Sequence, residues 1–382
     1  MASTSYIEID RDALDSNISF LKGLLGNATQ ISAVLKGNAY GHGLSTILPA
    51  LEELGIDHFS VYSSAEARQA HEHASPGSII MVMGYIDPGD LEWIIRHNVE
   101  FYISDPDSLE AALVAAQQLG VAAKIHLELE TGMYRTGLTL PQLRLAISVL
   151  LANTDLLHVR GISSHFAGAE SIANDKRVRK QFTIFNLRVK QLKEAGVVPR
   201  HRHIACSAAA INYPDTRLDL VRTGVLIYGY WPTRETFLKY FHRRKEKSDP
   251  LKRVMNWHTF VAQVKNVPLG DFIGYGISFQ AIRKMRIMVV PVGYCNGYSR
   301  SLSNNGHVIV RGQRSPVIGQ VNMNMIICDV TDIPDVKPGD KVILIGKQGE
   351  MEITVSSFAD MNNSLNYEIL ARLPENFVRI LS

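Results

Sequence analysis

A single lysine follows a short, largely apolar run near the start of the chain. Residues 31–35 read Ile-Ser-Ala-Val-Leu, and Lys36 is followed by the small and turn-forming stretch 37–43. This pattern is typical of a buried strand that delivers one amine to the mouth of a site. A partly desolvated amine can form a Schiff base with an aldehyde cofactor or a carbonyl substrate. The alternative is a strand-end lysine whose ammonium group reaches solvent.

Four further strand ends carry side chains that are useful in catalysis. They supply a guanidinium, an imidazole, a hydroxyl and a second guanidinium: Arg135, His165, Ser207 and Arg222. Each of them alone could be structural. In a parallel barrel, however, the carboxyl ends of the strands line one mouth. Five such groups converging there, Lys36 included, indicate a catalytic site.

The elements that would position these groups alternate between strand and helix. The expected strands are residues 31–36, 58–63, 78–84, 100–104, 123–130, 159–165, 201–207 and 219–228. Helical patterns cover residues 107–119, 140–151 and 176–195. This alternation predicts a parallel α/β sheet. About eight such units favour a (β/α)₈ barrel over an open doubly wound sheet.

The pattern changes after about residue 256. Strand-like segments at 259–267, 284–292, 307–311, 320–330 and 341–345 follow without long helices between them. Turn residues such as Asn304-Asn305-Gly306 and Pro338-Gly339-Asp340 separate some of them. We therefore predict two domains, a barrel over residues 1–238 and a mostly-β domain over residues 239–382. The polar, basic segment 239–253 is expected to be a solvated connection between them.

Composition narrows the class of protein. The 382 residues carry a formal net charge of +3, too small to suggest a nucleic-acid partner. The sequence has no apolar run long enough to span a membrane and does not begin like a secretion signal, so we expect a cytoplasmic protein. The three cysteines are far apart and lack metal-ligand spacing, so no metal site is expected.

Several segments resemble one family. Val34–Gly43, Val-Leu-Lys-Gly-Asn-Ala-Tyr-Gly-His-Gly, closely resembles the cofactor-lysine motif of alanine racemases, which depend on pyridoxal 5′-phosphate. Further matches follow in order along nearly the whole chain: His165-Phe166-Ala167, Cys206-Ser207-Ala208, Asp219–Gly224, Asp271–Gly276, Gly293–Arg300, Val321–Asn324 and Asn366–Leu370.

The resemblance implies a cofactor site built around Lys36. By this match His165 packs against the cofactor ring, and Arg222 faces the pyridine nitrogen. The phosphate is held by Tyr40, Ser207 and Tyr367 and by backbone N–H groups of Gly224 and Val225. Arg135 contacts the phenolate oxygen. Because arginine does not give up its proton, the ring nitrogen should stay unprotonated, which discourages competing carbanion chemistry such as transamination.

The resemblance also implies two proton carriers on opposite faces of the substrate. Lys36 serves one face, and Tyr275 of the partner subunit in a head-to-tail homodimer serves the other, tuned by His165. Tyr294 lines the substrate entrance, and the backbone of Met323, together with Arg135, binds the substrate.

Some positions depart from the family pattern. Glu128 stands seven residues before Arg135, where many members have a carbamylated lysine. We expect its carboxylate to orient Arg135; the alternative is a glutamate that points outward. Neutral residues replace charged ones around the entrance: Asn296, Gln320 and Asn324. These changes put strict alanine specificity in doubt, although Tyr367 keeps the bulk typical of a small pocket.

The resemblance thus implies an isomerase that interconverts L- and D-alanine, as a source of a peptidoglycan precursor. Alternatives of the same fold are a broad-specificity racemase, or one acting on serine or basic amino acids. An amino-acid decarboxylase fits less well, because such enzymes usually place an acid where Arg222 stands. A non-catalytic pyridoxal-phosphate carrier would lack the second domain.

Overall fold

A computed structural model describes residues 4–244, 248–362 and 366–382. The chain divides into two compact units. We call residues 13–37 and 47–252 the barrel unit, and residues 1–12, 38–46 and 253–382 the β unit. The division is not contiguous in the chain, because the first strand and the segment just after Lys36 group with the C-terminal residues.

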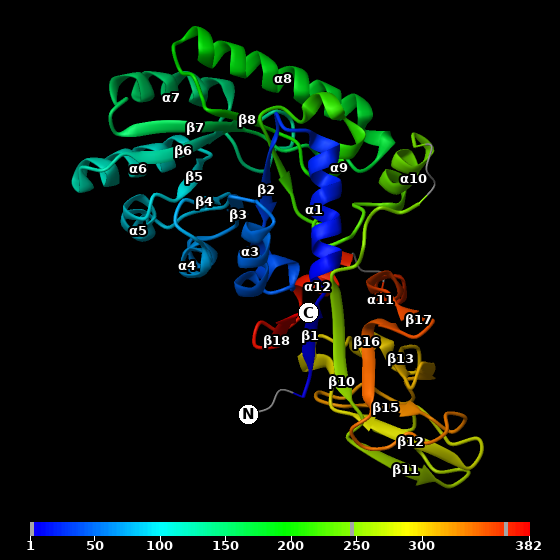
Figure 1. Ribbon diagram of the computed structural model, residues 1–382. Coiled ribbons are helices and arrows are strands. Elements are labelled where there is room, and N and C mark those ends of the chain that lie inside the picture. Colours follow the sequence, from blue (N-terminus) through cyan, green and yellow to red (C-terminus); the bar gives the residue numbers. More distant parts are fainter. Residues whose placement is uncertain (1–3, 245–247, 363–365) are drawn as a thin grey trace. The chain divides into compact units, whose positions relative to one another are not determined.

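The barrel unit contains an eight-stranded sheet in which all paired strands are parallel (Figure 1). Its strands are β2 (Gln30–Val34), β3 (His58–Val61), β4 (Ile79–Val82), β5 (Glu100–Ile103), β6 (Ala123–Glu128), β7 (Leu157–Ser163), β8 (His201–His203) and β9 (Leu220–Thr223). The order runs from β8 down to β2 and then to β9. The two edge strands meet through a bridge between Cys206 and Arg222, so the sheet closes. The predicted (β/α)₈ barrel is confirmed.

Helices follow most of the barrel strands (Figure 1). They are α1 (Arg11–Leu25), α2 (Lys36–Tyr40), α3 (Leu44–Glu53), α4 (Ser64–His73), α5 (Leu91–Arg96), α6 (Pro106–Leu119), α7 (Leu140–Ala152), α8 (Asp175–Glu194), α9 (Ser207–Asn212) and α10 (Arg234–His242). Short 3₁₀ turns are η1 (Pro88–Asp90), η2 (Ile172–Asn174) and η3 (Pro214–Thr216).

Helix α6 shows how local sequence sets these boundaries. Asp105 accepts a hydrogen bond from the backbone of Ser108 in a capping box, and Gly120 ends the helix in the left-handed conformation. The apolar side chains of Leu109 and Ala112 are buried between these ends. The sequence prediction for this helix is therefore correct to within one residue.

The β unit contains two sheets (Figure 1). One has the order β14-β13-β16-β10-β1-β18, with β17 paired to β16, and the other has the order β11-β12-β15. The strands are β1 (Tyr6–Ile9), β10 (Met255–Phe260), β11 (Gln263–Val267), β12 (Met285–Val290), β13 (His307–Val310), β14 (Gln313–Pro316), β15 (Ile326–Asp329), β16 (Lys341–Gln348), β17 (Met351–Ile353) and β18 (Val378–Leu381). The predicted mostly-β character is confirmed.

Shorter elements complete the β unit. They are η4 (Tyr294–Asn296), η5 (Arg300–Leu302), α11 (Val355–Asn362) and α12 (Asn366–Ala371). An apolar cluster around Met285, Ile287 and Ile318 supports the sheet that carries β12.

The basic segment expected as a connection is partly helical. Helix α10 continues to His242, so residues 239–242 are ordered helix rather than linker, and Tyr240 is buried. Lys245, Glu246 and Lys247 lie outside the described residues.

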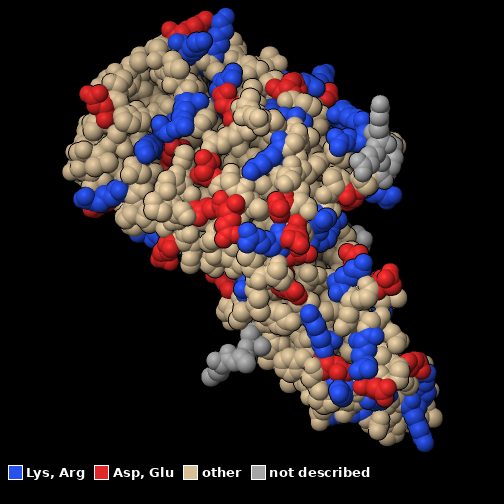
Figure 2. Space-filling view, viewed as in Figure 1, with Lys and Arg blue, Asp and Glu red and all other residues tan. Residues whose placement is uncertain are grey.

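The charges of the chain are mixed rather than grouped by sign. On the face shown in Figure 2, Lys and Arg side chains lie among Asp and Glu over both units, as the net charge of +3 leads one to expect. Among the described residues, no helix is long and apolar enough to cross a bilayer.

Candidate active site

Lys36 lies at the mouth of the barrel. It follows the end of β2 by two residues and is the first residue of α2. Its side chain is exposed, yet burial against neighbouring protein atoms, together with the cations Arg135 and Arg222, lowers its pKa against the opposing effect of Glu66. A lowered pKa makes the neutral, nucleophilic amine more abundant at neutral pH. This is the state that the sequence analysis required of Lys36.

The backbone after Lys36 is strained. Gly37, Asn38, Ala39, Tyr40 and Gly41 have φ values of 63°, 52°, 54°, 52° and 78°. Consecutive left-handed residues are rare, because each L-residue with a Cβ loses roughly 1–2 kcal/mol in that conformation. Strain of this kind persists only where the surroundings impose it, and it is common at functional sites.

Specific hydrogen bonds hold this left-handed turn. The Asn38 side chain accepts from the backbone N–H of Leu44 at 2.7 Å, and its carbonyl accepts from Gly43 at 3.0 Å. His42 Nδ1 lies 3.0 and 2.9 Å from the carbonyl oxygens of Ala39 and Tyr40. Because carbonyl oxygens only accept, Nδ1 must carry the proton. The motif residues Asn38 and His42 therefore build the turn that presents Tyr40.

Arg222 lies on β9 with its guanidinium buried among acceptors. Nη1 donates to His203 Nδ1 at 2.6 Å, and Nη2 donates to the Ser164 carbonyl at 2.7 Å. Longer bonds reach the carbonyls of His203 and Ile204. Within the described residues no acceptor is bonded to Nε. The fold thus fixes both Nη groups and leaves the Nε–H for a bound molecule.

His165 follows the end of β7 and is held neutral. Burial, followed by the nearby charges of Arg222, Arg135 and Lys36, lowers its pKa to about 3. These mutual electrostatic effects place the four side chains in one neighbourhood within the barrel unit. Arg135 and His165 also line the same cavity of the barrel unit.

Glu128 ends β6 and points inward. It is buried, and burial raises its pKa, while a hydrogen bond with Thr136 and the charge of Arg135 act in the opposite direction. The alternative of a glutamate pointing outward is therefore wrong. The charge of Arg135 acts on this carboxyl group, and the orienting role of Glu128 stays a prediction.

Ser207 and Gly224 form a small polar corner. Ser207 is the first residue of α9, and its hydroxyl oxygen accepts from the Gly224 backbone N–H at 3.0 Å. Val225 follows and is buried. A hydroxyl and backbone N–H groups are the kinds of donor that suit an anion such as a phosphate.

The remaining predicted site residues belong to the β unit. The rings of Tyr40 and Tyr367 meet edge to face, with centroids 6.3 Å apart. Tyr294 and Met323 are also neighbours, since the N–H groups of Tyr294 and Cys295 donate to the carbonyls of Asn322 and Met323, both at 3.0 Å.

Tyr275 lies in the turn region between β11 and β12 and is 69% exposed. It is flanked by Gly274 and Gly276, whose φ values are 80° and 66°. The flanking glycines allow a backbone path that raises the phenol above the unit's surface.

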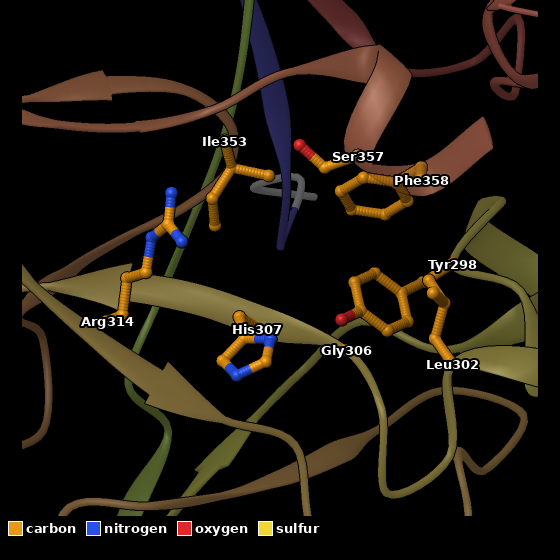
Figure 3. Close-up of a pocket in the computed structure, with 8 residues that line it drawn as sticks. All are labelled: Tyr298, Leu302, Gly306, His307, Arg314, Ile353, Ser357 and Phe358. Carbon is orange, nitrogen blue, oxygen red and sulfur yellow. The ribbon is translucent and has the colours of Figure 1, made fainter. Parts of the chain in front are cut away.

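Two cavities differ in their chemistry. The larger, about 340 Å³, lies in the β unit and is lined by Tyr298, Leu302, Gly306, His307, Arg314, Ile353, Ser357 and Phe358 (Figure 3). None of these is a predicted site residue. The smaller, about 180 Å³, lies in the barrel unit, and its lining includes Glu128, Arg135 and His165. The titratable groups, rather than the size, identify the barrel cavity as part of the site.

Two polar residues near the site, Glu66 and His203, were not predicted from the sequence. Glu66 accepts from the backbone N–H of Gly37 at 2.7 Å and influences Lys36, although nothing in its sequence context singles it out. His203 touches Arg222, and its alternation with His201 on an expected strand was the available signal. Among the described residues, no cluster of His, Cys, Asp or Glu is arranged to hold a metal ion.

Solved structures share both parts of this architecture. An alanine racemase from Clostridium difficile 630 superposes with a TM-score of 0.91 at 27% identity, covering 100% of this chain and 96% of that one. A Bacillus anthracis alanine racemase, solved with bound L-Ala-P, gives a TM-score of 0.90 at 28% identity, covering 100% of this chain and 96% of that one. A barrel followed by a mostly-β part is thus an architecture that this chain shares with solved amino-acid racemases.

Sequence comparisons give the family. The model for the alanine racemase N-terminal domain matches residues 9–232, and that for the C-terminal domain matches residues 254–381. Alanine racemase 1 of Caldanaerobacter subterraneus is 33% identical over 98% of this chain and 94% of its own length. A broad specificity amino-acid racemase of Pseudomonas taetrolens is 35% identical over 95% of this chain and 86% of its own. The chain belongs to the alanine racemase family and is an isomerase whose cofactor is pyridoxal 5′-phosphate.

Proposed function

We propose that the protein interconverts L- and D-alanine by a two-base mechanism. The observation that carries this proposal is the Lys36 amine, whose pKa is lowered and which shares the barrel mouth with Arg135, His165 and Arg222. Free amino acids are its substrates, and we place the enzyme in the cytoplasm, where D-alanine would feed peptidoglycan precursors.

The donor set of the barrel unit fits pyridoxal 5′-phosphate. Lys36 offers an amine to the aldehyde, and the Nε–H of Arg222 suits an unprotonated ring nitrogen. Within the barrel unit, Ser207, Gly224 and Val225 offer a phosphate corner. The family resemblance adds the phenols of Tyr40 and Tyr367. Arg135 suits the phenolate oxygen. When bound, the cofactor supplies an electron sink that acidifies the substrate's α-hydrogen.

The chain's own groups would then move the proton. Lys36 takes or returns it on one face, which we assign to the hydrogen of the D-isomer. Its lowered pKa lets the amine do so near neutral pH. Tyr275 of the partner subunit would serve the opposite face. Its high exposure on its own chain supports this role, because a phenol offered to another subunit must project from the surface. The neutral imidazole of His165 is suited to receive the phenol's hydrogen bond.

The neutral residues expected at the entrance weigh against strict alanine specificity. Asn296 accepts from the backbone N–H of Gly293 at 3.0 Å, and Gln320 accepts from Arg300 at 2.9 Å. Asn324 donates to Cys295 Sγ at 2.9 Å. Each of these neutral side chains is therefore bonded to a neighbour, which for Gln320 is the charged Arg300. A broad-specificity racemase is the second candidate, favoured by the 35% identity to the Pseudomonas taetrolens protein.

Incubating the purified protein with single L-amino acids tests this function. We expect L-alanine to approach an equal mixture of both isomers, measured by chiral chromatography, with serine slower and lysine and arginine slowest. Release of an amine and carbon dioxide would instead identify a decarboxylase. No conversion of any amino acid by the cofactor-loaded protein would identify a carrier.

Glu128→Gln is expected to lower the rate of alanine racemisation by about tenfold, because the variant loses the negative charge beside Arg135 while keeping the side chain's shape. Added bicarbonate should not restore the rate, since no lysine carbamate is involved. Glu92→Gln, which alters an exposed pair with Arg96, is the control and should match the unmodified enzyme. Unchanged turnover in Glu128→Gln would remove Glu128 from the site.

A further inference from the structure

A chain of buried polar side chains runs across the barrel away from Arg222. Arg222 Nη1 lies 2.6 Å from His203 Nδ1, and His203 Nε2 lies 2.9 Å from His126 Nδ1. His126 Nε2 lies 2.7 Å from Glu100 Oε2. All four residues are at most 5% exposed. The chain therefore links β9, β8, β6 and β5 through side chains that solvent does not reach.

The chemistry of its two ends fixes the direction of every bond. A guanidinium only donates, so His203 Nδ1 must accept, which leaves its proton on Nε2. That N–H then donates to His126 Nδ1, whose own proton must be on Nε2. An ionised carboxylate only accepts, so His126 Nε2–H donates to Glu100. Both imidazoles are thereby held in the Nε2–H tautomer.

The protonation states of these hydrogen-bonded side chains agree with this pattern. Burial, followed by the charge of Arg222, holds the pKa of His203 well below its usual value, so its imidazole is neutral. Burial alone would raise the pKa of Glu100, but hydrogen bonds from His126 and Arg160 and the nearby His58 lower it to about 2. Glu100 is therefore ionised. Its second oxygen accepts from Arg160 Nε at 3.0 Å.

The fold makes room for this chain at one glycine. Strand β7 lies between the strands that carry His126 and His203, and Gly161 is at the crossing point. A Cβ on Gly161 would overlap His126 Nδ1 and come within 2.9 Å of His203 Nε2. The pairing of β6 with β7 also shifts by one residue just before Gly161. This irregularity inserts Arg160, whose side chain reaches Glu100.

We propose that Glu100, His126 and His203 are positioning residues that fix which N–H Arg222 presents to the cofactor. The proposal rests on the proposed function, in which the Arg222 Nε–H faces the ring nitrogen. Because His203 Nδ1 can only accept, it holds Arg222 Nη1 in a hydrogen bond, and Arg222 Nε remains available to donate to the cofactor. If the tautomer of His203 reversed, its Nδ1–H would face an Nη1–H, and this repulsion would turn the guanidinium away.

This arrangement gives Glu100 an influence on the choice of reaction. A guanidinium that leaves the ring nitrogen lets water protonate it, and a protonated ring stabilises a carbanion for longer. Loss of the carboxylate should therefore slow racemisation and raise the share of transamination. The Michaelis constant should change little, because none of these residues is expected to touch the substrate.

Nitrogen-15 NMR of histidine-labelled protein tests the tautomers directly, with and without cofactor. We expect His126 and His203 to show protonated Nε2 and unprotonated Nδ1 in both forms. In Glu100→Gln the Nδ1–H tautomer of His126 and His203 should gain population. The kcat of racemisation should fall about tenfold, because the hydrogen bond to the charged carboxylate is lost. The share of transamination should rise. Tyr102→Phe is the matched control, since its ring packs on both imidazoles with centroids 6.0 and 6.1 Å away. It should leave the tautomers unchanged.

The outcomes separate the inference from the proposed function. Doubly protonated imidazoles, or Nδ1–H tautomers in the unmodified protein, would overturn the inference even if the enzyme racemises alanine. Altered tautomers with unchanged kcat and reaction ratio would also overturn it. An absence of racemisation with the expected tautomers would instead contradict the proposed function. If Glu100→Gln does not fold, His203→Asn and His203→Leu replace it. Asparagine keeps a hydrogen-bond acceptor near Arg222, and leucine does not. A ratio of racemisation to transamination that is higher in His203→Asn than in His203→Leu supports the inference, and equal ratios contradict it.

Discussion

Replacing Lys36 by methionine is expected to abolish alanine racemisation, lowering kcat by more than about a thousandfold. Methionine has a similar length but has neither an amine for the aldehyde cofactor nor a proton carrier. The groups that influence the pKa of Lys36 are Arg135, Glu66, Arg222 and Cys206, and none of them is an amine that could take its place. Both the attachment of the cofactor and the proton transfer should therefore fail together.

Two measurements check this result. Racemisation is followed from each isomer of alanine, and covalent attachment is followed by mass spectrometry after reduction with borohydride. Lys190→Met is the control, because that lysine lies on the surface of α8 in a pair with Glu194. Retained attachment at another residue, with racemisation intact, would show that Lys36 is not the cofactor lysine.

The barrel could be predicted because its signals are local. Apolar strands followed by amphipathic helices repeat along residues 31–230, and the expected strand 123–130 agrees with β6 at 123–128. The last strand was expected too long, at 219–228, because apolar residues continue past Thr223. The structure instead turns there, and Leu226 and Ile227 are buried outside the strand. Hydrophobic periodicity reports burial and does not by itself separate a strand from a packed turn.

The β unit depended on contacts that periodicity does not contain. Strand β1 pairs with β10, joining Tyr6 to His258, and with β18, joining Tyr6 to Val378. A four-residue strand has no partner within its own stretch of sequence, so its existence follows only from distant segments. Helices α11 and α12 were also not expected, because they are short and lie among strands.

The candidate site divides in the same way. Side chains at strand ends, such as Lys36 and Arg222, could be found because parallel strands bring their carboxyl ends together. The left-handed turn after Lys36 could not, because three of its residues, Asn38, Ala39 and Tyr40, are not glycine. Its cause lies in the hydrogen bonds that later residues make. The hydrogen bonds from Arg222 to Glu100 likewise join four strands and pass a glycine. Contacts between such distant segments leave no pattern in the local sequence.

Tyr275→Phe is expected to lower racemisation by about a hundredfold or more in both directions, because one face of the α-carbon loses its acid and base. Exchange on the other face should continue, since Lys36 is intact. D-alanine incubated in deuterium oxide should therefore still gain deuterium at its α-carbon, measured by mass spectrometry, although it does not become L-alanine. Tyr85→Phe, which changes another highly exposed tyrosine, is the control and should racemise normally.

Mixing two inactive variants then tests whether the site is shared between subunits. Lys36→Met and Tyr275→Phe chains, unfolded together and refolded with cofactor, should form hybrid dimers. One site of each hybrid would hold both substitutions, and the other would hold Lys36 of one chain and Tyr275 of its partner. Random pairing makes about half of the dimers hybrid, so about a quarter of the normal activity should return. If each chain supplied its own tyrosine, every site would lack one base and no activity would return. Full racemisation by Tyr275→Phe alone would remove the phenol from the mechanism.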